Sequence, residues 1–170
     1  CHEVEEIVQE CFLRNFHSRV HLEPFGSLAC SLALRDASDL DVNICIDQVL
    51  EGPSDFSQRA DCVKALQALK ESLKATDLVT GRLQMVFRDN PRLSFTHSSG
   101  VSMDIIINER YPVMNTLVMD HFCASDHRLR TLILILKTWA KHRGIGNAQK
   151  NGLSSHVYAL MAMHFFQRMG

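Results

Sequence analysis

The spacing of hydrophobic residues predicts two parts of different character. In the first part, Val4, Val8 and Cys11 recur every three or four positions, which predicts an amphipathic helix over residues 4–16. Alternation with a period of two, bounded by Gly, Pro and Asn, predicts strands after this helix. The further elements expected in this part are strands over 20–25, 39–46, 83–88, 92–97 and 101–108, a short helix over 27–32, and a helix carrying Val63, Leu66, Leu69 and Leu73.

After Tyr111-Pro112 the pattern becomes helical. Asp126 is a favourable N-cap and Gly144 a favourable stop for a long helix between them. The helices expected here cover residues 117–122, 127–143 and 154–169.

The order of these elements indicates an α+β fold, in which a mixed α and β part is followed by an all-helical lobe. We expect a domain boundary that divides residues 1–112 from residues 113–170. We assign the N-terminal helix to the first domain, with packing on the helical lobe as the open alternative.

Composition narrows the class of protein. The chain has 170 residues, 46% of them hydrophobic, and a net charge of −1, which excludes a disordered chain and gives no sign of a strongly basic surface. It has no run of eighteen apolar residues, and its first residues do not form a basic region followed by an apolar segment, so we expect neither a membrane span nor a secretory signal. Six cysteines without a C-x-x-C pair indicate reduced thiols in an intracellular protein, with cytoplasm and mitochondrion both open. The chain begins at Cys1, so we expect a piece of a longer protein.

Two aspartates begin the apolar strand expected at 39–46. Alternation places Asp39, Asp41 and Asn43 on one face of that strand. Asp104 interrupts a second apolar strand in the same way. Neighbouring carboxylates repel each other, and a divalent cation such as Mg²⁺ relieves that repulsion while taking further oxygens from phosphates. A cap or an ion pair would explain one such aspartate but is a poorer explanation of all three.

Two other features are compatible with anion binding. Gly26 lets the backbone approach a ligand, and a helix that starts at Ser27 offers free N–H groups. Lys137 and Lys141 lie one helical turn apart, with Arg130 two turns before Lys137. These cations form either a solvated face or a set of phosphate contacts. His17 and His21 have the i, i+4 spacing of metal ligands, but we find no acidic third ligand nearby in the sequence, so a zinc site there is weakly supported.

Four ordered motifs resemble a known family. FGSLACSLALRDASDLDV, followed by Asp104, resembles the nucleotidyltransferase signature of the DNA polymerase β superfamily. LRTLILILKTWAKHRGI and NGLSSHVYALMAMHFFQ narrow the resemblance to terminal uridylyltransferases and cytoplasmic-type poly(A) polymerases. The resemblance implies a polymerase β-like nucleotidyltransferase fold. It places a mixed sheet with flanking helices in a catalytic domain over 1–112, followed by an incomplete PAP-associated helical lobe over 113–170.

The resemblance also implies a reaction. An RNA 3′-hydroxyl would attack a nucleoside triphosphate and release pyrophosphate, with two Mg²⁺ or Mn²⁺ ions at the site. UTP is the expected nucleotide and ATP the alternative; a catalytically silent RNA-binding scaffold is the alternative of another class. No membrane partner is expected, and protein partners stay open.

Individual roles follow from the same resemblance. Asp39 and Asp41 would bind both ions, and Asp104 would complete the metal site and help activate the 3′-hydroxyl. The residues implied as nucleotide contacts are Gly26, Ser27, Lys137, Lys141 and Ser155 for the phosphates, Asn108, Asn115 and Thr116 for the ribose, and His156 for the base.

Three positions differ from the usual family pattern. Cys30 and Ser31 stand where Thr or Ser and then Gly are usual, and both are small enough to keep a close approach to phosphate. His156 stands where a base-stacking Tyr is usual, and its smaller ring offers less stacking area.

Overall fold

The chain folds into two compact units. A computed structural model describes residues 2–35, 39–50, 56, 58–87, 90–146 and 152–169. Unit 1 comprises Cys1–Gly26 and Asp39–Val113, and unit 2 comprises Ser27–Ser38 and Met114–Gly170. The segment that follows Gly26, which we expected in the first domain, belongs to unit 2 because Cys30 and Leu32 are buried in that unit's core.

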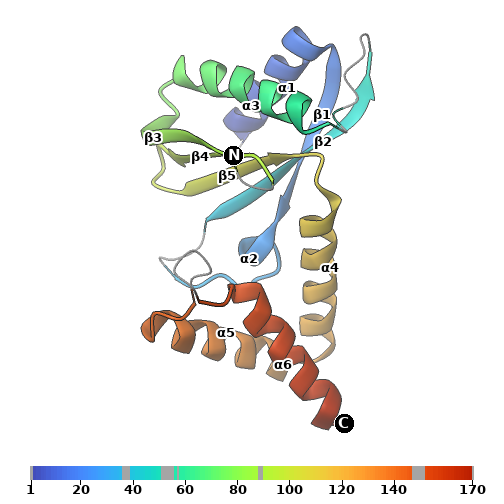
Figure 1. Ribbon diagram of the computed structural model, residues 1–170, viewed down its shortest axis with the longest axis vertical. Coiled ribbons are helices and arrows are strands. Elements are labelled where there is room, and N and C mark those ends of the chain that lie inside the picture. The colour runs from blue at the N-terminus through green and yellow to red at the C-terminus, as the bar shows by residue number, and fades with distance from the viewer. Residues whose placement is uncertain are drawn as a thin grey trace. The chain divides into compact units, whose positions relative to one another are not determined.

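A five-stranded mixed sheet forms the basis of unit 1 (Figure 1). Its strands are β1 (Ser18–Phe25), β2 (Leu40–Val49), β3 (Val79–Val86), β4 (Arg92–His97) and β5 (Ser102–Ile107). They lie in the order β1-β2-β5-β4-β3. The pair β2 and β5 is parallel, and the other neighbouring pairs are antiparallel. Together with its helices, this sheet confirms the predicted α+β fold.

Two helices, α1 (His2–Phe16) and α3 (Arg59–Lys74), cover one face of this sheet (Figure 1). Alternate strand residues point into the core beneath them, among them Ile44 and Ile105, neither of which is exposed. Helix α1 packs on β1 and α3 and so belongs to unit 1 rather than to the helical unit. The opposite face of the sheet carries the polar strand residues.

Strand β3 begins at Val79 instead of residue 83. Its pairing with β4 is irregular between Thr80 and Gln84, and this irregularity breaks the alternation on which the strand prediction depended. The buried Phe56 was also not expected in the core; its ring centroid lies 5.8 Å from that of Phe12.

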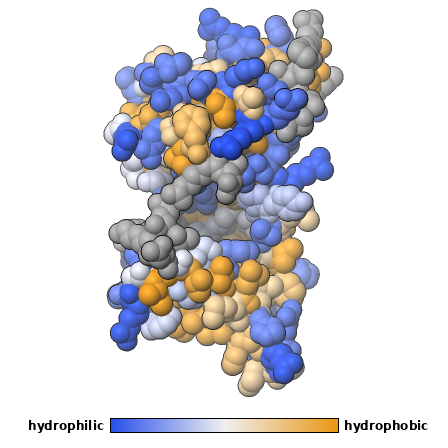
Figure 2. Space-filling model, in the orientation of Figure 1, coloured by the Kyte–Doolittle hydropathy of each residue, from blue (hydrophilic) through white to orange (hydrophobic). Residues whose placement is uncertain are grey.

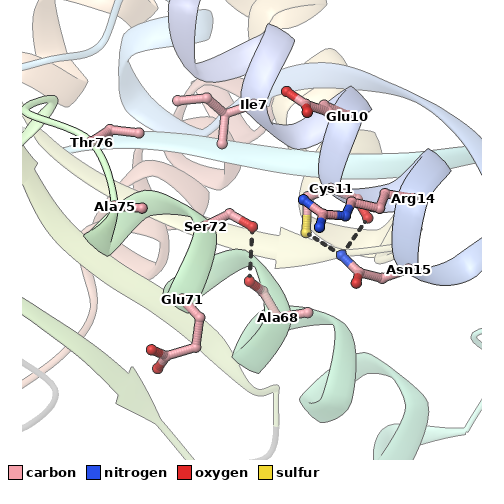
Figure 3. Close-up of a pocket in the computed structure, with 10 residues that line it drawn as sticks. All are labelled: Ile7, Glu10, Cys11, Arg14, Asn15, Ala68, Glu71, Ser72, Ala75 and Thr76. Carbon is pink, nitrogen blue, oxygen red and sulfur yellow. Dashed lines mark hydrogen bonds between the residues drawn. The ribbon is translucent and has the colours of Figure 1, made fainter.

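A cavity of about 420 Å³ lies between α1 and α3 (Figure 3). Its polar groups are partly satisfied within their own helices, because Ser72 donates to Ala68 O at 3.2 Å and Asn15 donates to Cys11 O at 2.9 Å. This cavity belongs to the helical layer and not to the sheet face that carries the aspartates.

The core of unit 2 is helical. Its main helices are α5 (His127–His142), α6 (Ser155–Met169) and α4 (Arg110–Ser125), which enters the unit at Met114. The short α2 (Gly26–Ala29) enters it at Ser27. Residues from several of them, including Met119, Ile133 and Ala162, are buried together. Helix α4 is longer than the expected 117–122 because Pro112 is its third residue, in the first turn, where proline is tolerated.

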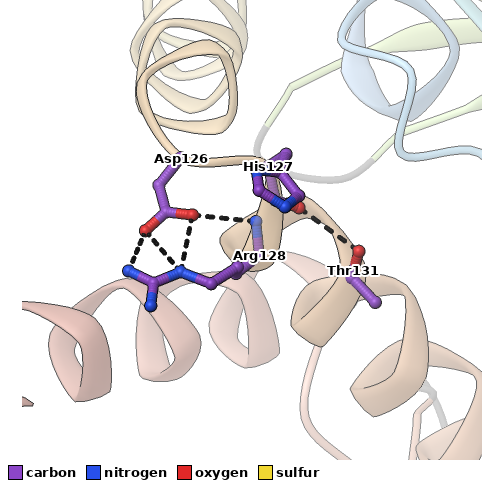
Figure 4. A network of polar contacts seen from close by, with 4 residues as sticks. All are labelled: Asp126, His127, Arg128 and Thr131. Atoms are coloured by element: carbon purple, nitrogen blue, oxygen red, sulfur yellow. Dashed lines mark hydrogen bonds and ion pairs between the residues drawn. The ribbon is translucent and has the colours of Figure 1, made fainter.

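The predicted cap of α5 is confirmed (Figure 4). The Asp126 carboxylate accepts a hydrogen bond from Arg128 N at 2.9 Å and another from the Arg128 guanidinium at 2.7 Å. The hydrogen bond from the Arg128 side chain is the main reason that the pKa of Asp126 falls to about 2. Asp126 therefore stays charged at the helix N-terminus, where negative charge is favourable.

Many hydrophobic side chains lie on the visible face of unit 2 (Figure 2). Those exposed on α6 include Leu160, Met161 and Phe165.

Within the described ranges, no helix has both the length and the apolar character needed to cross a membrane.

Candidate active site

Asp41 and Asp104 lie opposite each other on the two parallel strands. Their Cα atoms are register partners between β2 and β5. Val42 and Ile105 point into the helix-covered core, so the two aspartates point to the other face of the sheet. Asp39 comes just before β2 and is close enough for its charge to act on Asp41. The structure thus brings the three predicted acids to one region of unit 1.

These carboxylates repel one another. Burial raises the pKa of Asp41 to about 6, together with the charges of Asp104 and Asp39. Burial and the Asp104 charge raise the pKa of Asp39 as well. In both cases Arg92 acts in the opposite direction. A carboxyl with a pKa near 6 ionises only against an energetic penalty, which a bound cation would remove.

Arg92, the first residue of β4, forms an ion pair with one of these acids. Its Nε lies 2.8 Å from Asp104 Oδ2 as an ion pair, although the two groups are not aligned as a hydrogen bond. The sequence pattern did not single out Arg92. The signal available in the sequence was the alternation of the apolar residues Leu93 and Phe95, which are buried in the core. This alternation places Arg92 and Ser94 on the opposite face of the strand, the face on which Asp104 lies.

A cavity of about 310 Å³ opens next to this ion pair. Its walls include Asp39, Asp104 and Arg92 and continue to Arg82 and Gln84 of β3. The cavity therefore combines an acidic part with a wall that bears two guanidinium groups. This distribution of charge suits a ligand that carries phosphates and a cation together.

The backbone of Gly26 lies close to the side chain of Asp41. Its φ is +77°, in the left-handed region, and a β-carbon built on it would lie 2.2 Å from Asp41 Oδ2. The close approach follows from the β1–β2 register, which pairs Phe25 with Asp41. A side chain at this position would therefore displace the Asp41 carboxylate, whatever Gly26 also does for a triphosphate.

The helix after Gly26 is a single turn. Helix α2 ends at Ala29 and not near residue 32 as expected, because Ser31 has a φ of +56°. The carbonyl of Ser27 accepts a hydrogen bond from Leu32 N at 2.8 Å. A helix of 4 residues has little macrodipole, so individual N–H groups would have to carry any phosphate binding near Ser27.

The aspartates fit Mg²⁺ or Mn²⁺ by donor type. They offer only carboxylate oxygens, which hard divalent cations prefer. Within the part of the chain that the structure describes, the ligand atoms that all lie within 4.8 Å of one another belong to His21, Glu23 and Cys45 instead. The three aspartates would therefore have to converge on an ion, and the charge of that ion would offset their repulsion.

Two asparagines border the acids. Asn43 is buried, and its Oδ1 accepts a hydrogen bond from Glu109 N at 3.0 Å. Asn108 has a φ of +53°, and its backbone N donates to Ile44 O at 2.8 Å. The Asn108 side chain is exposed, and its contact with a ribose stays a prediction.

In unit 2, two of the predicted cations bind backbone carbonyls. Lys137 Nζ donates to Leu32 O, and Arg130 Nη1 donates to Cys30 O at 2.8 Å and to Ser31 O at 3.2 Å. Burial lowers the pKa of Lys137. These side chains hold the segment after α2 against α5 and do not form a fully solvated face.

The other candidate residues of unit 2 lie on helices. Lys141 and Asn115 are exposed on α5 and α4, while Thr116 is 9% exposed. Ser155 and His156 are exposed at the start of α6. Their contacts with a nucleotide stay predictions.

Curated proteins similar to this chain include two kinds of RNA 3′-end enzyme. Terminal uridylyltransferase 7 of Homo sapiens is 28% identical over 160 residues, which are 94% of this chain and 10% of that protein. Poly(A) RNA polymerase GLD2 of Danio rerio is 29% identical over 134 residues, 78% of this chain and 26% of that protein. The chain thus spans less than a third of the length of these relatives.

Solved structures have the same fold. A cytoplasmic RNA terminal U-transferase aligns with a TM-score of 0.70 at 25% identity, covering 96% of this chain and 46% of that one. The structure of the noncanonical poly(A) polymerase complex GLD-2–GLD-3 contains a chain that aligns with a TM-score of 0.77 at 23% identity. The alignment covers 97% of this chain and 51% of that one.

A family model matches residues 1–124, a range that includes Gly26 and all three aspartates. The chain therefore belongs to the family described as poly(A) RNA polymerase, mitochondrial-like, central palm domain.

Proposed function

We propose that the chain carries the catalytic centre of a template-independent RNA 3′-terminal nucleotidyltransferase. The proposed reaction adds UMP from UTP to an RNA 3′ end, with AMP from ATP as the alternative. The observation that carries the proposal is the pairing of Asp41 with Asp104 across β2 and β5, with Asp39 beside them. The similarity to uridylyltransferases and to poly(A) polymerases supports the class of reaction.

The reaction is an in-line displacement at phosphorus. The RNA 3′-oxygen forms a bond to the α-phosphorus, and the bond from that phosphorus to the bridging oxygen of pyrophosphate breaks. Asp39 and Asp41 would hold two divalent ions, and Asp104 would complete their site and take the hydroxyl proton. When bound, these ions would stabilise the attacking and the leaving oxygens.

Neighbouring residues of unit 1 position these acids. Arg92 restrains the Asp104 carboxylate through their ion pair, and Gly26 leaves room for Asp41. Fixing the reacting groups in place supplies much of the catalysis in such displacements. The nucleotide contacts proposed above, from Gly26 and Ser27 to His156, are retained as part of this proposal.

Extension of a labelled RNA oligonucleotide by UTP, with Mg²⁺ or Mn²⁺, tests the proposal. Asp41→Asn and Asp104→Asn should each lower the rate at least about 100-fold, because each removes a ligand of the ions that stabilise the transition state. Asp77→Asn is the matched control, since Asp77 is an exposed acid in the turn before β3. Equal rates for all three variants and the wild type would refute the site.

Competition among the four nucleoside triphosphates distinguishes UTP from ATP. Predominant incorporation of AMP would select the poly(A) alternative. Nucleotide binding that strengthens with Mg²⁺ but yields no extended RNA would support the silent scaffold instead.

A further inference from the structure

A second cluster of metal-ligating side chains lies on the polar face of the sheet. One ring nitrogen of His21, one carboxylate oxygen of Glu23 and the Cys45 sulfur all lie within 4.8 Å of one another. His21 and Cys45 are register partners across β1 and β2, and Glu23 is two residues from His21 on the same strand. The strand register therefore sets the spacing of the three ligands.

We propose that His21, Glu23 and Cys45 form a binding site for one transition-metal ion of the Zn²⁺ class, separate from the aspartate site. A nitrogen, an oxygen and a sulfur ligand form a donor set typical of Zn²⁺, which favours four ligands in a tetrahedron. Mg²⁺ takes oxygen ligands only, so this donor set distinguishes the two sites. A water molecule would supply the fourth ligand.

The distances are near those that such an ion requires. Cys45 Sγ lies 3.3 Å from Glu23 Oε2. Zinc–sulfur and zinc–oxygen bonds at a tetrahedral angle place these two atoms about 3.6 Å apart. All three ligand atoms lie within 4.8 Å of one another, so a modest rearrangement of the side chains would bring them to one ion.

Outer hydrogen bonds of the usual kind are present. His21 Nδ1 lies 2.5 Å from Asp47 Oδ1. A metal-bound histidine typically donates its second ring N–H to a carboxylate, which fixes the tautomer and leaves the other nitrogen for the metal. In addition, Asn43 Nδ2 donates to Cys45 Sγ at 3.3 Å, an interaction that favours a thiolate.

Binding requires the Cys45 thiol to lose its proton to solvent. Burial, the hydrogen bond to Glu23 and the charges of Glu23 and Asp47 raise the pKa of this thiol to about 11. The cation therefore replaces the proton as the partner of the carboxylates, and its charge compensates theirs.

An ion at this site would tie β1 to β2. Gly26 follows β1 directly and Asp41 lies on β2, so the link would stabilise the strand pair that holds both. The proposal does not depend on nucleotidyl transfer and holds whether or not the chain has that activity.

Cobalt binding to the 170-residue chain tests the proposal. The chain is freed of metal with a chelator and titrated with Co²⁺ and then Zn²⁺ in excess Mg²⁺, which occupies sites built only of oxygen. We expect one Co²⁺ per chain, a thiolate-to-cobalt absorption band, and displacement of that Co²⁺ by Zn²⁺.

Variants assign the ligands. Cys45→Ser should abolish the band and weaken binding more than about 100-fold, and Asp47→Asn should weaken it about 10- to 100-fold. Cys62→Ser, which changes another partly buried free thiol, should bind as the wild type does. His21→Ala provides a second ligand variant, and circular dichroism shows that each variant is folded.

The absence of a stoichiometric band in the wild type would overturn the proposal. So would unchanged binding by folded Cys45→Ser or His21→Ala, or an equal loss in Cys62→Ser, because either result would assign the cobalt to thiols elsewhere in the chain.

Discussion

A β-carbon on Gly26 would lie 2.2 Å from the Oδ2 atom of Asp41, a separation that real contacts do not reach. The glycine ahead of the acidic motif therefore has a role inside the protein: it provides the space in which a proposed metal ligand stands. Two residues that are distant in sequence are linked here because β1 and β2 pair in register.

Gly26→Ala should consequently disable the site. The left-handed φ of +77° costs an alanine about 1–2 kcal/mol, and the new methyl group must push the Asp41 carboxylate away. We expect a modest loss in the free energy of unfolding and a much larger loss of RNA extension, measured by urea unfolding and by primer extension.

Gly100→Ala is the matched control. Gly100 has a φ of +85°, and a β-carbon there would meet nothing within 4 Å. This variant should lose similar stability and keep its activity. Equal losses of activity in the two variants would show that backbone strain, and not the displaced carboxylate, is responsible.

Asp41→Asn should stabilise the metal-free chain above about pH 6. The pKa of Asp41 is about 6 in the folded state and about 3.9 in an unfolded chain, so the folded state binds more protons between these values. The stability of the wild type therefore falls as the pH rises from about 4 to 6, while the asparagine variant lacks this loss. Because the group is partly exposed, we expect a difference on the order of 1–2 kcal/mol at pH 7.5.

Urea unfolding of both proteins at pH 4, 6 and 7.5 checks this difference. Mg²⁺ should reduce it at pH 7.5, since the cation compensates the charge of the wild-type carboxylate. A difference that shrinks as the pH rises would show that Asp41 is not held near its neighbours' charges.

The strands and the acids could be predicted from the sequence because both depend on local alternation. A polar residue that interrupts an apolar strand, such as Asp41 or Asp104, is visible without knowledge of strand order. The contact of Arg92 with Asp104 depends on β4 lying beside β5, and no local pattern reports that. The same holds for Cys45, which meets His21 only through the β1–β2 register.

Arg92→Gln should raise the affinity of unit 1 for Mn²⁺ and lower RNA extension. Removing the guanidinium makes the site more negative. At a partly exposed site this should raise the Mn²⁺ affinity by roughly 3- to 10-fold. It also frees the Asp104 carboxylate from the ion pair that restrains it. Isothermal titration measures the first effect and primer extension the second.

Arg82→Gln is the control for Arg92. Arg82 lines the same cavity but forms no ion pair with an aspartate among the described residues. Replacing Arg82 should change the Mn²⁺ affinity less than replacing Arg92 does. A drop in Mn²⁺ affinity for Arg92→Gln would show that Arg92 supports ion binding and does not compete with it.

Lys137→Met and Lys141→Met should separate structure from ligand binding. Loss of the Lys137 ammonium leaves the Leu32 carbonyl without this donor and should cost about 1–3 kcal/mol of unfolding free energy. Lys141 is exposed, so its loss should leave stability unchanged. If both contact phosphates, both variants should also bind nucleotide more weakly. An unchanged unfolding free energy in Lys137→Met would mean that its backbone contact contributes nothing to stability.

His156→Tyr should raise the affinity for nucleotide if the base stacks at the start of α6. Stacking on an aromatic ring is worth about 1–3 kcal/mol per base, and tyrosine offers more ring area than histidine, so a gain of about 3- to 10-fold is expected. His164→Tyr makes the same change at another exposed position of the same helix and should have no effect. Fluorescence titration with UTP and with ATP measures both variants. Equal gains in the two would indicate nonspecific binding to an added tyrosine, and no gain in His156→Tyr would place the base away from this residue.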